Sequence, residues 1–219
     1  MRPIFVTGTG TDVGKTHILS ALLEAHRAAG GKARIMKPVI SGFDPAQLNA
    51  TDTIRLMRAN GDELTGEGVQ SVSPWRFKAA LSPDMAAFKE GRDLMIDSVV
   101  NWCLDRIDRA LPTVIEGAGG VMSPLATDGL NLDLMRELDA RPILVTGAYL
   151  GAISHTLTAL RVMDAHCTVV VNDYKAAPVP AVDTARSIQR FAPRADVRVF
   201  SGDASGLLDL LDPAVLAAS

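Results

Sequence analysis

The sequence is organised around Gly8-Thr9-Gly10-Thr11-Asp12-Val13-Gly14-Lys15-Thr16. An apolar run at residues 3–6 precedes this stretch and predicts a buried strand, and apolar residues recur at helical spacing over residues 18–23. A glycine-rich turn between a strand and a helix directs backbone N–H groups into one concavity, and the helix N-terminus adds partial positive charge. The stretch therefore predicts a phosphate-binding loop, with Lys15 reaching the outer phosphates and Thr16 placed for Mg²⁺.

This loop is one residue longer than the common phosphate-binding pattern. The pattern places a glycine five positions before Gly14, where this chain has Thr9, and Gly8 comes one position too early. The alternative is an ordinary strand-to-helix turn that happens to contain Gly-Lys-Thr. The strand before it, the helix after it and Gly-Lys-Thr at the junction together favour the phosphate-binding loop.

Length and composition predict one globular domain spanning residues 1–219, with 47% hydrophobic and 21% charged residues. A net charge of −3 gives no electrostatic footprint for nucleic acid. Cys103 and Cys167 are the only cysteines and have no metal-type neighbours, which favours a reducing cytoplasm. We expect no signal peptide, because the N-terminus leads directly into the strand at residues 3–6. We also expect no membrane partner, because no apolar run approaches the ~20 residues that span a bilayer.

Apolar segments alternate with helical patterns along the rest of the chain. Such a pattern indicates an α/β fold, with a parallel sheet covered by helices on both faces. Strands are expected at residues 33–36, 113–115, 142–146, 168–171 and 197–200, and helices begin near residues 51, 96, 131, 151 and 178. We expect residues 43–50 to form a loop, and residues 61–74 show no clear period.

In parallel sheets, ligands bind beyond the carboxyl ends of the strands. The residues expected at that edge are mostly polar or glycine: Lys15, Thr16, Lys37, Ser41, Glu116, Gly151 and Asn172. Pro38 makes a helix unfavourable after Lys37, so Lys37 and Ser41 are expected at a strand end and in the loop beyond it.

Three side chains, two from this edge and one from a nearby helix start, could carry chemistry. Glu116 ends an apolar strand, where a carboxylate can hold Mg²⁺, and Asp52 is a second candidate ligand. Helix capping explains Asp52 equally well, because Thr51-Asp52 would begin a helix. Lys37 would add a second positive charge near the terminal phosphate, although most lysines are simply exposed. The four histidines lack partners at metal-ligand spacing, so we interpret them as structural or exposed.

Five motifs in order resemble those of the dethiobiotin synthetases. They are the extended loop at residues 8–16, Lys37-Pro38-Val39-Ile40-Ser41-Gly42, Val114-Ile115-Glu116-Gly117-Ala118-Gly119-Gly120, Leu150-Gly151-Ala152-Ile153-Ser154-His155 and Val171-Asn172-Asp173. The resemblance implies a P-loop ligase of biotin synthesis that uses ATP and Mg²⁺. Such an enzyme joins CO₂ to 7,8-diaminononanoate and closes a cyclic urea by way of a phosphorylated carbamate.

The resemblance also implies roles for individual residues. Lys15 and Lys37 would stabilise the carbamate and the transferred phosphoryl group, and Mg²⁺ would bind to Thr16, Asp52 and Glu116. Nucleotide would contact Gly10, Thr11, Asp12, Val13, Gly14, Lys15, Thr16, His17, Glu116 and Asn172. Substrate would contact Thr11, Lys37, Ser41 and Gly119, and its carboxylate would bind at Gly151, Ala152, Ile153 and Ser154 of the other subunit of a homodimer.

The sequence departs from the family pattern at three places. Asp84 stands where a histidine is expected, Ser154 where relatives often have asparagine, and residues 200–203 lack an expected Ile-Pro pair near the base. The first two affect substrate contacts, and the third affects selectivity for adenine.

Three other classes of P-loop protein are alternatives. A nucleotide switch acting through a protein or membrane partner usually carries an extra lysine early in the loop, and none lies between Thr7 and Lys15. A GTPase would need an Asn-Lys-x-Asp motif, which Asn172-Asp173-Tyr174 does not provide. An amidating synthetase would need a glutaminase domain, for which the chain has no room.

Overall fold

The computed structural model describes residues 1–108, 110–163, 166–173 and 179–212. A six-stranded sheet of order β10-β9-β8-β1-β5-β2 runs through its centre, and every pair of neighbouring strands in it is parallel. This confirms the predicted α/β fold. The strands are β1 (Ile4–Gly8), β2 (Arg34–Met36), β5 (Thr113–Glu116), β8 (Arg141–Gly147), β9 (Thr168–Asn172) and β10 (Asp196–Phe200).

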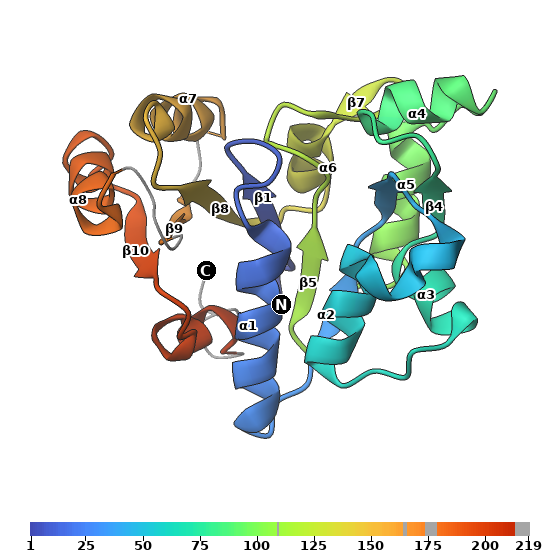
Figure 1. The fold of residues 1–219 in the computed structure, drawn as a ribbon, viewed down its shortest axis with the longest axis horizontal. Helices are drawn as coiled ribbons and strands as arrows, with labels where there is room; N and C mark the ends of the chain where they lie inside the picture. The colour runs from blue at the N-terminus through green and yellow to red at the C-terminus, as the bar shows by residue number, and fades with distance from the viewer. Residues whose placement is uncertain (109, 164–165, 174–178, 213–219) are drawn as a thin grey trace.

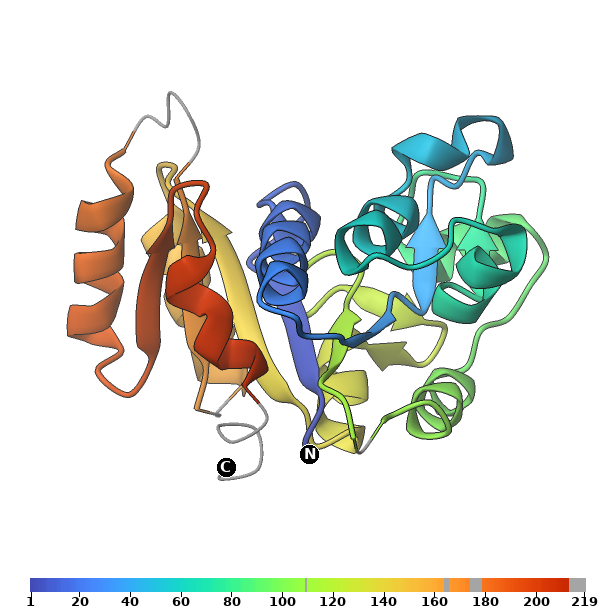
Figure 2. The same ribbon diagram turned by 90° about the horizontal axis from the view of Figure 1, so that it is seen from below.

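Helices cover both faces of this sheet, and each face has its own apolar core (Figure 1). One core is built with α1 (Lys15–Ala28), α2 (Asp52–Asn60), α3 (Gly66–Val72) and η2 (Ser205–Leu211). The other is built with α4 (Pro83–Lys89), α5 (Ile96–Leu104), α6 (Asn131–Glu137), α7 (Ala152–Met163) and α8 (Ala181–Phe191). Figure 2 shows α8 and η2 on opposite sides of β10. The central strands are buried on both faces, which is why their sequences are apolar throughout.

Two small sheets lie outside the main one. Strand β3 (Val39–Ser41) pairs in parallel with β4 (Trp75–Phe77), and β6 (Pro124–Ala126) pairs with β7 (Gly129–Leu130) in antiparallel fashion. The prediction that Ser41 lies in a loop is therefore wrong, because residues 39–41 pair with residues 75–77, which are distant in the sequence.

Two other local expectations are also wrong. Residues 45–50, expected in a loop, form the 3₁₀ helix η1 (Pro45–Ala50), whose first turn is capped by the Asp44 carboxylate accepting from the Ala46 N–H at 2.9 Å. Helix α3 lies inside residues 61–74, where no element was expected, and Thr65 caps it by accepting from the Gly68 N–H at 3.0 Å. Short, polar elements have too few turns to show an apolar period.

The later elements follow the sequence pattern more closely. Helix α5 begins at Ile96 as expected and places Cys103 in the core, but it ends at Leu104, which is 49% exposed. Helix α8 begins at Ala181; the predicted start at residue 178 and the tail beyond residue 212 lie outside the described residues. None of the helices in the described part of the chain is both long and apolar enough to cross a membrane.

Candidate active site

A cavity of about 350 Å³ opens at the carboxyl ends of β1, β2 and β5. Segments far apart in the sequence contribute to its wall, and most of the predicted site residues lie there. It is lined by Thr11, Asp12, Gly14, Lys15, Thr16, His17, Lys37, Val39, Ile40, Ser41, Asp52, Arg55, Glu116, Gly117, Ala118 and Gly119. The predicted phosphate loop, Mg²⁺ ligands and second lysine are therefore brought together in one place.

The loop between β1 and α1 has the conformation that a phosphate site requires. Gly14, at the N-cap of α1, has a φ of 97°, a left-handed conformation that glycine adopts without steric cost. Helix α1 therefore presents its free N–H groups to the cavity. The Lys15 ammonium curls back to donate to the Gly10 carbonyl at 3.0 Å, and Lys15 is buried.

A second lysine lies between two carboxylates at the floor of this cavity. Lys37 follows β2 directly, and its Nζ donates to Asp52 Oδ2 at 2.8 Å and to Glu116 Oε1. Thr16 Oγ1 donates to the same Glu116 oxygen at 2.7 Å. Lys37 and Glu116 are both buried, whereas the Asp52 side chain is 41% exposed. The cluster joins the P-loop helix, β2, β5 and α2.

Burial and neighbouring charges shift the pKa values of both lysines. Burial lowers the pKa of Lys15 below its ordinary value; Glu116 opposes this effect and the Lys37 charge adds to it. Burial also acts to lower the pKa of Lys37, but attraction to Glu116 and Asp52, with hydrogen bonds to both, raises it overall. Lys37 therefore remains a fixed positive charge at neutral pH.

The residues at the floor fit a hard divalent cation. Glu116 Oε2 is buried and accepts no hydrogen bond from the residues that the structure describes. The Thr16 hydroxyl and the Asp52 carboxylate lie on the same cluster. A few oxygen ligands, completed by water and phosphate oxygens, are what Mg²⁺ prefers. Glu116 Oε2 is therefore the oxygen of this cluster that a cation would compensate most directly.

The two interpretations of Asp52 can now be separated in part. Thr51 is the N-cap of α2, and its hydroxyl accepts from the Ile54 N–H at 3.4 Å. Asp52 is the first residue of the helix and contacts Lys37 instead. Burial alone would raise the pKa of Asp52, but the Lys37 charge and hydrogen bond lower it overall. The cap is therefore Thr51, and Asp52 is directed toward the cavity.

Sequence reasoning missed two residues at this site. Asn131, the first residue of α6, is buried and donates through Nδ2 to the carbonyls of Ala118 at 2.6 Å and Gly120 at 2.9 Å. It thereby fixes the glycine loop that follows Glu116. Arg55, one turn after Asp52 on α2, lines the cavity. An asparagine at a helix start is commonly a cap, and an arginine on a polar helix face is commonly solvated, so neither gave a distinctive signal.

The predicted carboxylate site lies apart from this cavity. The residues Gly151, Ala152, Ile153 and Ser154 form the start of α7, where Gly151 has a φ of 97°, and none of them lines the cavity. Hydrogen bonds connect this turn to the P-loop. The Tyr149 hydroxyl lies 2.9 Å from His155 Nδ1 and 3.4 Å from the Thr9 hydroxyl.

The predicted base-contacting residue lies at the other side of the P-loop. Asn172 ends β9, is 2% exposed, and donates through Nδ2 to the Val13 carbonyl at 3.1 Å. It supports the loop from behind and does not line the cavity. The His17 ring packs edge-on against Phe200, with ring centroids 5.5 Å apart. Phe200 is buried, so the exposed His17 ring rests on the apolar core beside the start of α1.

Known proteins resemble this chain in sequence and in fold. A family model described as an AAA domain matches residues 2–201. The ATP-dependent dethiobiotin synthetase BioD of Caulobacter vibrioides is 43% identical over 222 residues, which cover 96% of this chain and 99% of the relative. The protein of the same name from Methylobacterium nodulans is 42% identical over 203 residues, covering 88% of this chain and 90% of the relative.

A further relative and a solved structure extend this likeness. The dethiobiotin synthetase BioD of Phenylobacterium zucineum is 50% identical over 166 residues, covering 74% of this chain and 70% of the relative. The MinC:MinD cell division protein complex of Aquifex aeolicus matches with a TM-score of 0.55 at 12% identity, covering 100% of this chain and 89% of that one, which supports the fold alone. By sequence likeness over nearly its whole length, with a phosphate-binding loop in the expected place, the chain belongs to the ATP-dependent dethiobiotin synthetase family.

Proposed function

We propose that this chain is an ATP- and Mg²⁺-dependent cyclo-ligase that carboxylates 7,8-diaminononanoate with CO₂ and closes the ureido ring. One amine forms a carbamate, the γ-phosphoryl group of ATP is transferred to the carbamate oxygen, and the second amine displaces phosphate. ADP, phosphate and dethiobiotin are released. The observation that supports this assignment most strongly is the pair of buried lysines, Lys15 and Lys37, in one cavity with Glu116.

The two lysines fit the charges that develop in this reaction. The carbamate and the transferred phosphoryl group are both anionic, and fixed positive charges held by the protein stabilise such groups without reorganisation. Lys37 is held in place by Asp52 and Glu116, so its ammonium is already positioned. The same charges disfavour an ammonium on the substrate, and each attacking amine must be uncharged.

Several side chains would hold the other reactants. Thr16, Asp52 and Glu116 would bind Mg²⁺, which neutralises phosphate charge when bound. The backbone of residues 10–17 would bind the phosphates, and Ser41, Thr11 and Gly119 would contact substrate beside Lys37. Asn172, whose Nδ2 also donates to the Val13 carbonyl, would contact the base.

The substrate carboxylate requires a positive site away from the phosphates. We assign it to the start of α7 in a second subunit, where the first turn carries no acidic side chain and the backbone N–H groups of Ile153 and Ser154 lack intrahelical acceptors. The Ala152 N–H is already used, because it donates to the Tyr149 carbonyl at 3.0 Å. Leu150, which precedes this turn, is 84% exposed, which suits a surface covered by a partner. The proposed enzyme is therefore a homodimer, with each active site built from two copies of one domain.

The proposed location of the enzyme is the cytoplasm. Cys103 and Cys167 are both free and buried, and burial raises the pKa of each thiol to about 12. Such thiols suit a reducing compartment, where no disulfide framework is needed.

The test is ATP hydrolysis by the full-length chain with and without diaminononanoate and bicarbonate. We expect phosphate release to require both compounds and to match dethiobiotin formed one for one. A nucleotide switch, the second candidate, would hydrolyse ATP at the same rate without them. That result would overturn the proposed ligase activity.

A further inference from the structure

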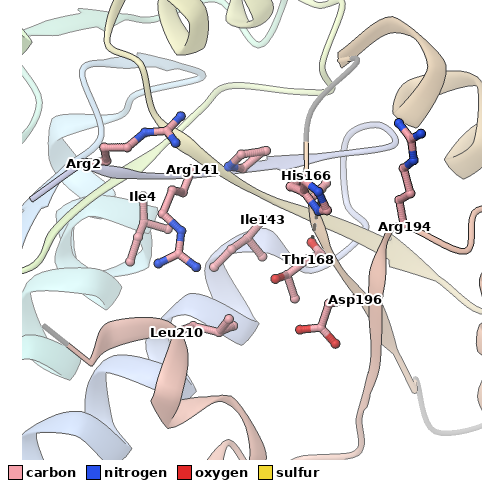
Figure 3. Close-up of a pocket in the computed structure, with 11 residues that line it drawn as sticks. Arg2, Ile4, Arg141, Ile143, His166, Thr168, Arg194, Asp196 and Leu210 are labelled. Atoms are coloured by element: carbon pink, nitrogen blue, oxygen red, sulfur yellow. Dashed lines mark hydrogen bonds between the residues drawn. The ribbon is translucent and has the colours of Figure 1, made fainter. Parts of the chain in front are cut away.

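The edge of the sheet opposite the P-loop carries a second cavity, of about 480 Å³, at the amino ends of β1, β8, β9 and β10 (Figure 3). The guanidinium groups of Arg141 and Arg194 point away from each other there, so they do not form one anion site. The P-loop cavity differs, because a third basic side chain joins its two lysines. Arg55, on α2, lines this cavity together with Lys15 and Lys37, and the proposed reaction leaves its charge unused.

Helix α2 fixes the position from which the Arg55 side chain extends. The Arg55 backbone N–H donates to the Thr51 carbonyl at 3.1 Å, which places Arg55 in the first turn of the helix. Ile54 and Leu56, on either side of it, are each 1% exposed, so the core holds the helix at this point. Arg55 itself is exposed, so its side chain extends from a rigid helix at the opening of the cavity.

Arg55 and Lys37 act on the same carboxylate. Asp52 precedes Arg55 by three residues, a spacing that places both side chains on one face of the helix. Burial acts to raise the pKa of Asp52, but the charge and hydrogen bond of Lys37 lower it, and the charge of Arg55 adds to this lowering. Two positive groups from different segments of the chain are therefore close to one point on the cavity wall.

Within the described part of the chain, the Arg55 guanidinium forms no ion pair. Asp52, the carboxylate nearest to it along the helix, is paired with Lys37 at 2.8 Å instead. The N–H donors of Arg55 are therefore available to an anion in the cavity. Arg58, three residues further along α2, is also exposed, but it does not line the cavity.

The anion that suits this position is the terminal phosphate of ATP. In a P-loop site, the lysine after the last glycine reaches the outer phosphates, and the threonine after it lies beside them. In this chain Thr16 and Lys37 both donate to Glu116, so the outer phosphates face this cluster. Asp52 belongs to the same cluster through Lys37, and Arg55 follows Asp52 on the same helix face.

We propose that Arg55 is a further phosphate-binding residue, which donates to the terminal phosphate of ATP from the opening of the cavity. This role rests on the proposed ATP-dependent reaction, in which that phosphate is transferred. A guanidinium presents several N–H donors in a planar fork that matches phosphate oxygens. ADP lacks the terminal phosphate, so the contact favours the triphosphate substrate over the diphosphate product.

The experiment measures the binding of ADP and of a non-hydrolysable ATP analogue to the full-length chain by calorimetry, with Mg²⁺ and without diaminononanoate. Arg55→Gln should weaken the ATP analogue about tenfold, because one charged hydrogen bond is lost, and should change the affinity for ADP by less than about twofold. Arg55→Lys should restore part of the affinity, since it keeps the charge and loses the fork. An equal loss for both nucleotides, or no loss for either, would overturn the proposal.

The matched control is Arg58→Gln, which makes the same charge change on the same helix outside the cavity. It should leave both affinities unchanged. A loss equal to that of Arg55→Gln would show a long-range charge effect and contradict a direct contact. Thermal unfolding checks the fold of each variant, and glutamine and arginine have similar helix propensities, so we expect little change in Tm.

The substrate carboxylate is the competing anion for Arg55. If Arg55 bound it, Arg55→Gln would raise the KM for diaminononanoate and leave the affinity for the ATP analogue unchanged, which would contradict the assignment to phosphate. The binding measurement needs no turnover, so its outcome is separate from that of the ligase assay. Failure of the proposed ligase activity would be seen in phosphate release, and failure of the Arg55 contact in the ratio of the two nucleotide affinities.

Discussion

The P-loop region and the turn before α7 were predicted to form one active site, but only the P-loop region forms a cavity with its predicted residues within a single chain. Around the P-loop, Thr16, Lys37 and Glu116 contact one another directly and line a cavity. In the turn before α7, the Tyr149 hydroxyl is hydrogen-bonded to His155. No residue of this turn lines the cavity. Phosphoryl transfer needs charges placed within one rigid frame, whereas the far end of a long substrate can be held by another subunit.

Exposed apolar side chains support this contrast. Leu150, directly before the turn, is 84% exposed, and Met122, two residues after the glycine loop fixed by Asn131, is 52% exposed. Neither residue lines the cavity that contains Lys37. Exposed apolar groups beside functional loops are typical of surfaces that a partner covers.

The largest expected effect concerns the P-loop region, where Lys37 contacts Glu116 and Asp52. Lys37→Ala should lower turnover by ~10²–10³-fold, because a fixed positive charge that meets charge developing in the transition state is lost. Steady-state dethiobiotin formation measures this. Lys32→Ala is the matched control, since Lys32 is exposed and does not line the active-site cavity. Near wild-type turnover of Lys37→Ala would contradict the role proposed for Lys37.

The second prediction tests whether one active site combines the P-loop region of one subunit with the turn before α7 of the other. Lys37→Ala and Ser154→Asp should each be nearly inactive, the latter because it places a negative charge against the substrate carboxylate. After dissociation and reassembly, random mixing makes half of the dimers mixed, and one of the two sites in each mixed dimer is intact. About a quarter of all sites should therefore recover activity.

The alternative to this shared site gives a different result. If each site lay within one subunit, every site in a mixed dimer would still carry one defect. The absence of any recovery, with mixed dimers shown to form by differential tagging, would rule out the shared site. Mixing Lys37→Ala with itself is the control for reactivation by the reassembly procedure.

The same division separates what the sequence could predict from what it could not. The P-loop was predictable because a strand, a glycine turn and a helix are adjacent in the chain, so local spacing determines their geometry. The strand ends at Lys37 and Glu116 were predictable because parallel strands align their carboxyl ends at one edge. No local pattern indicated that Lys37 contacts both carboxylates.

The missed features all depend on contacts between distant segments. Asn131 fixes the glycine loop through carbonyls that become available only when α6 packs beneath it. Ser41 joins a strand because residues 75–77 lie beside it. Thr51 is the cap because its backbone is extended and its hydroxyl accepts from the Ile54 N–H, while Asp52, the first helical residue, contacts Lys37 from a distant segment. Side chains that could act equally well in two local roles are assigned by tertiary contacts.

A smaller effect is expected from substitutions of the proposed Mg²⁺ ligands in the P-loop region. Thr16→Val, Glu116→Gln and Asp52→Asn should each raise the Mg²⁺ concentration at half-maximal activity. Glu116→Gln should raise it most, since Glu116 Oε2 is buried without a partner among the described residues. Titrating activity against Mg²⁺ measures this concentration for each variant.

The capping residue next to Asp52 provides the control for this titration. Thr51→Ala removes the α2 cap and should lower stability by about 0.5–2 kcal/mol, with no change in the Mg²⁺ midpoint. An unchanged midpoint for Asp52→Asn, with only its thermal stability reduced, would restrict Asp52 to a structural role.

The smallest expected effect is the pH dependence of stability at Asp52. Attraction to Lys37 outweighs burial and lowers the pKa of this carboxyl in the folded state. The unfolded chain therefore binds a proton more readily, and the ionised Asp52 stabilises the folded state above the ordinary pKa of ~3.9. This contribution is lost as the pH falls through the lower, folded-state pKa. Thermal unfolding without nucleotide or Mg²⁺ should give a Tm difference between wild type and Asp52→Asn.

That Tm difference should be constant from about pH 6 to 8 and should narrow below pH ~4, because protonation then neutralises the wild-type carboxyl as well. Asp52 is partly exposed, so solvent screening keeps the effect small. Asp97→Asn is the control, since Asp97 also lies in the first turn of a helix but has no ion-pair partner among the described residues. A Tm difference for Asp52→Asn that stays the same down to pH 3, or that equals the one for Asp97→Asn, would mean that the Lys37–Asp52 ion pair does not stabilise the folded chain.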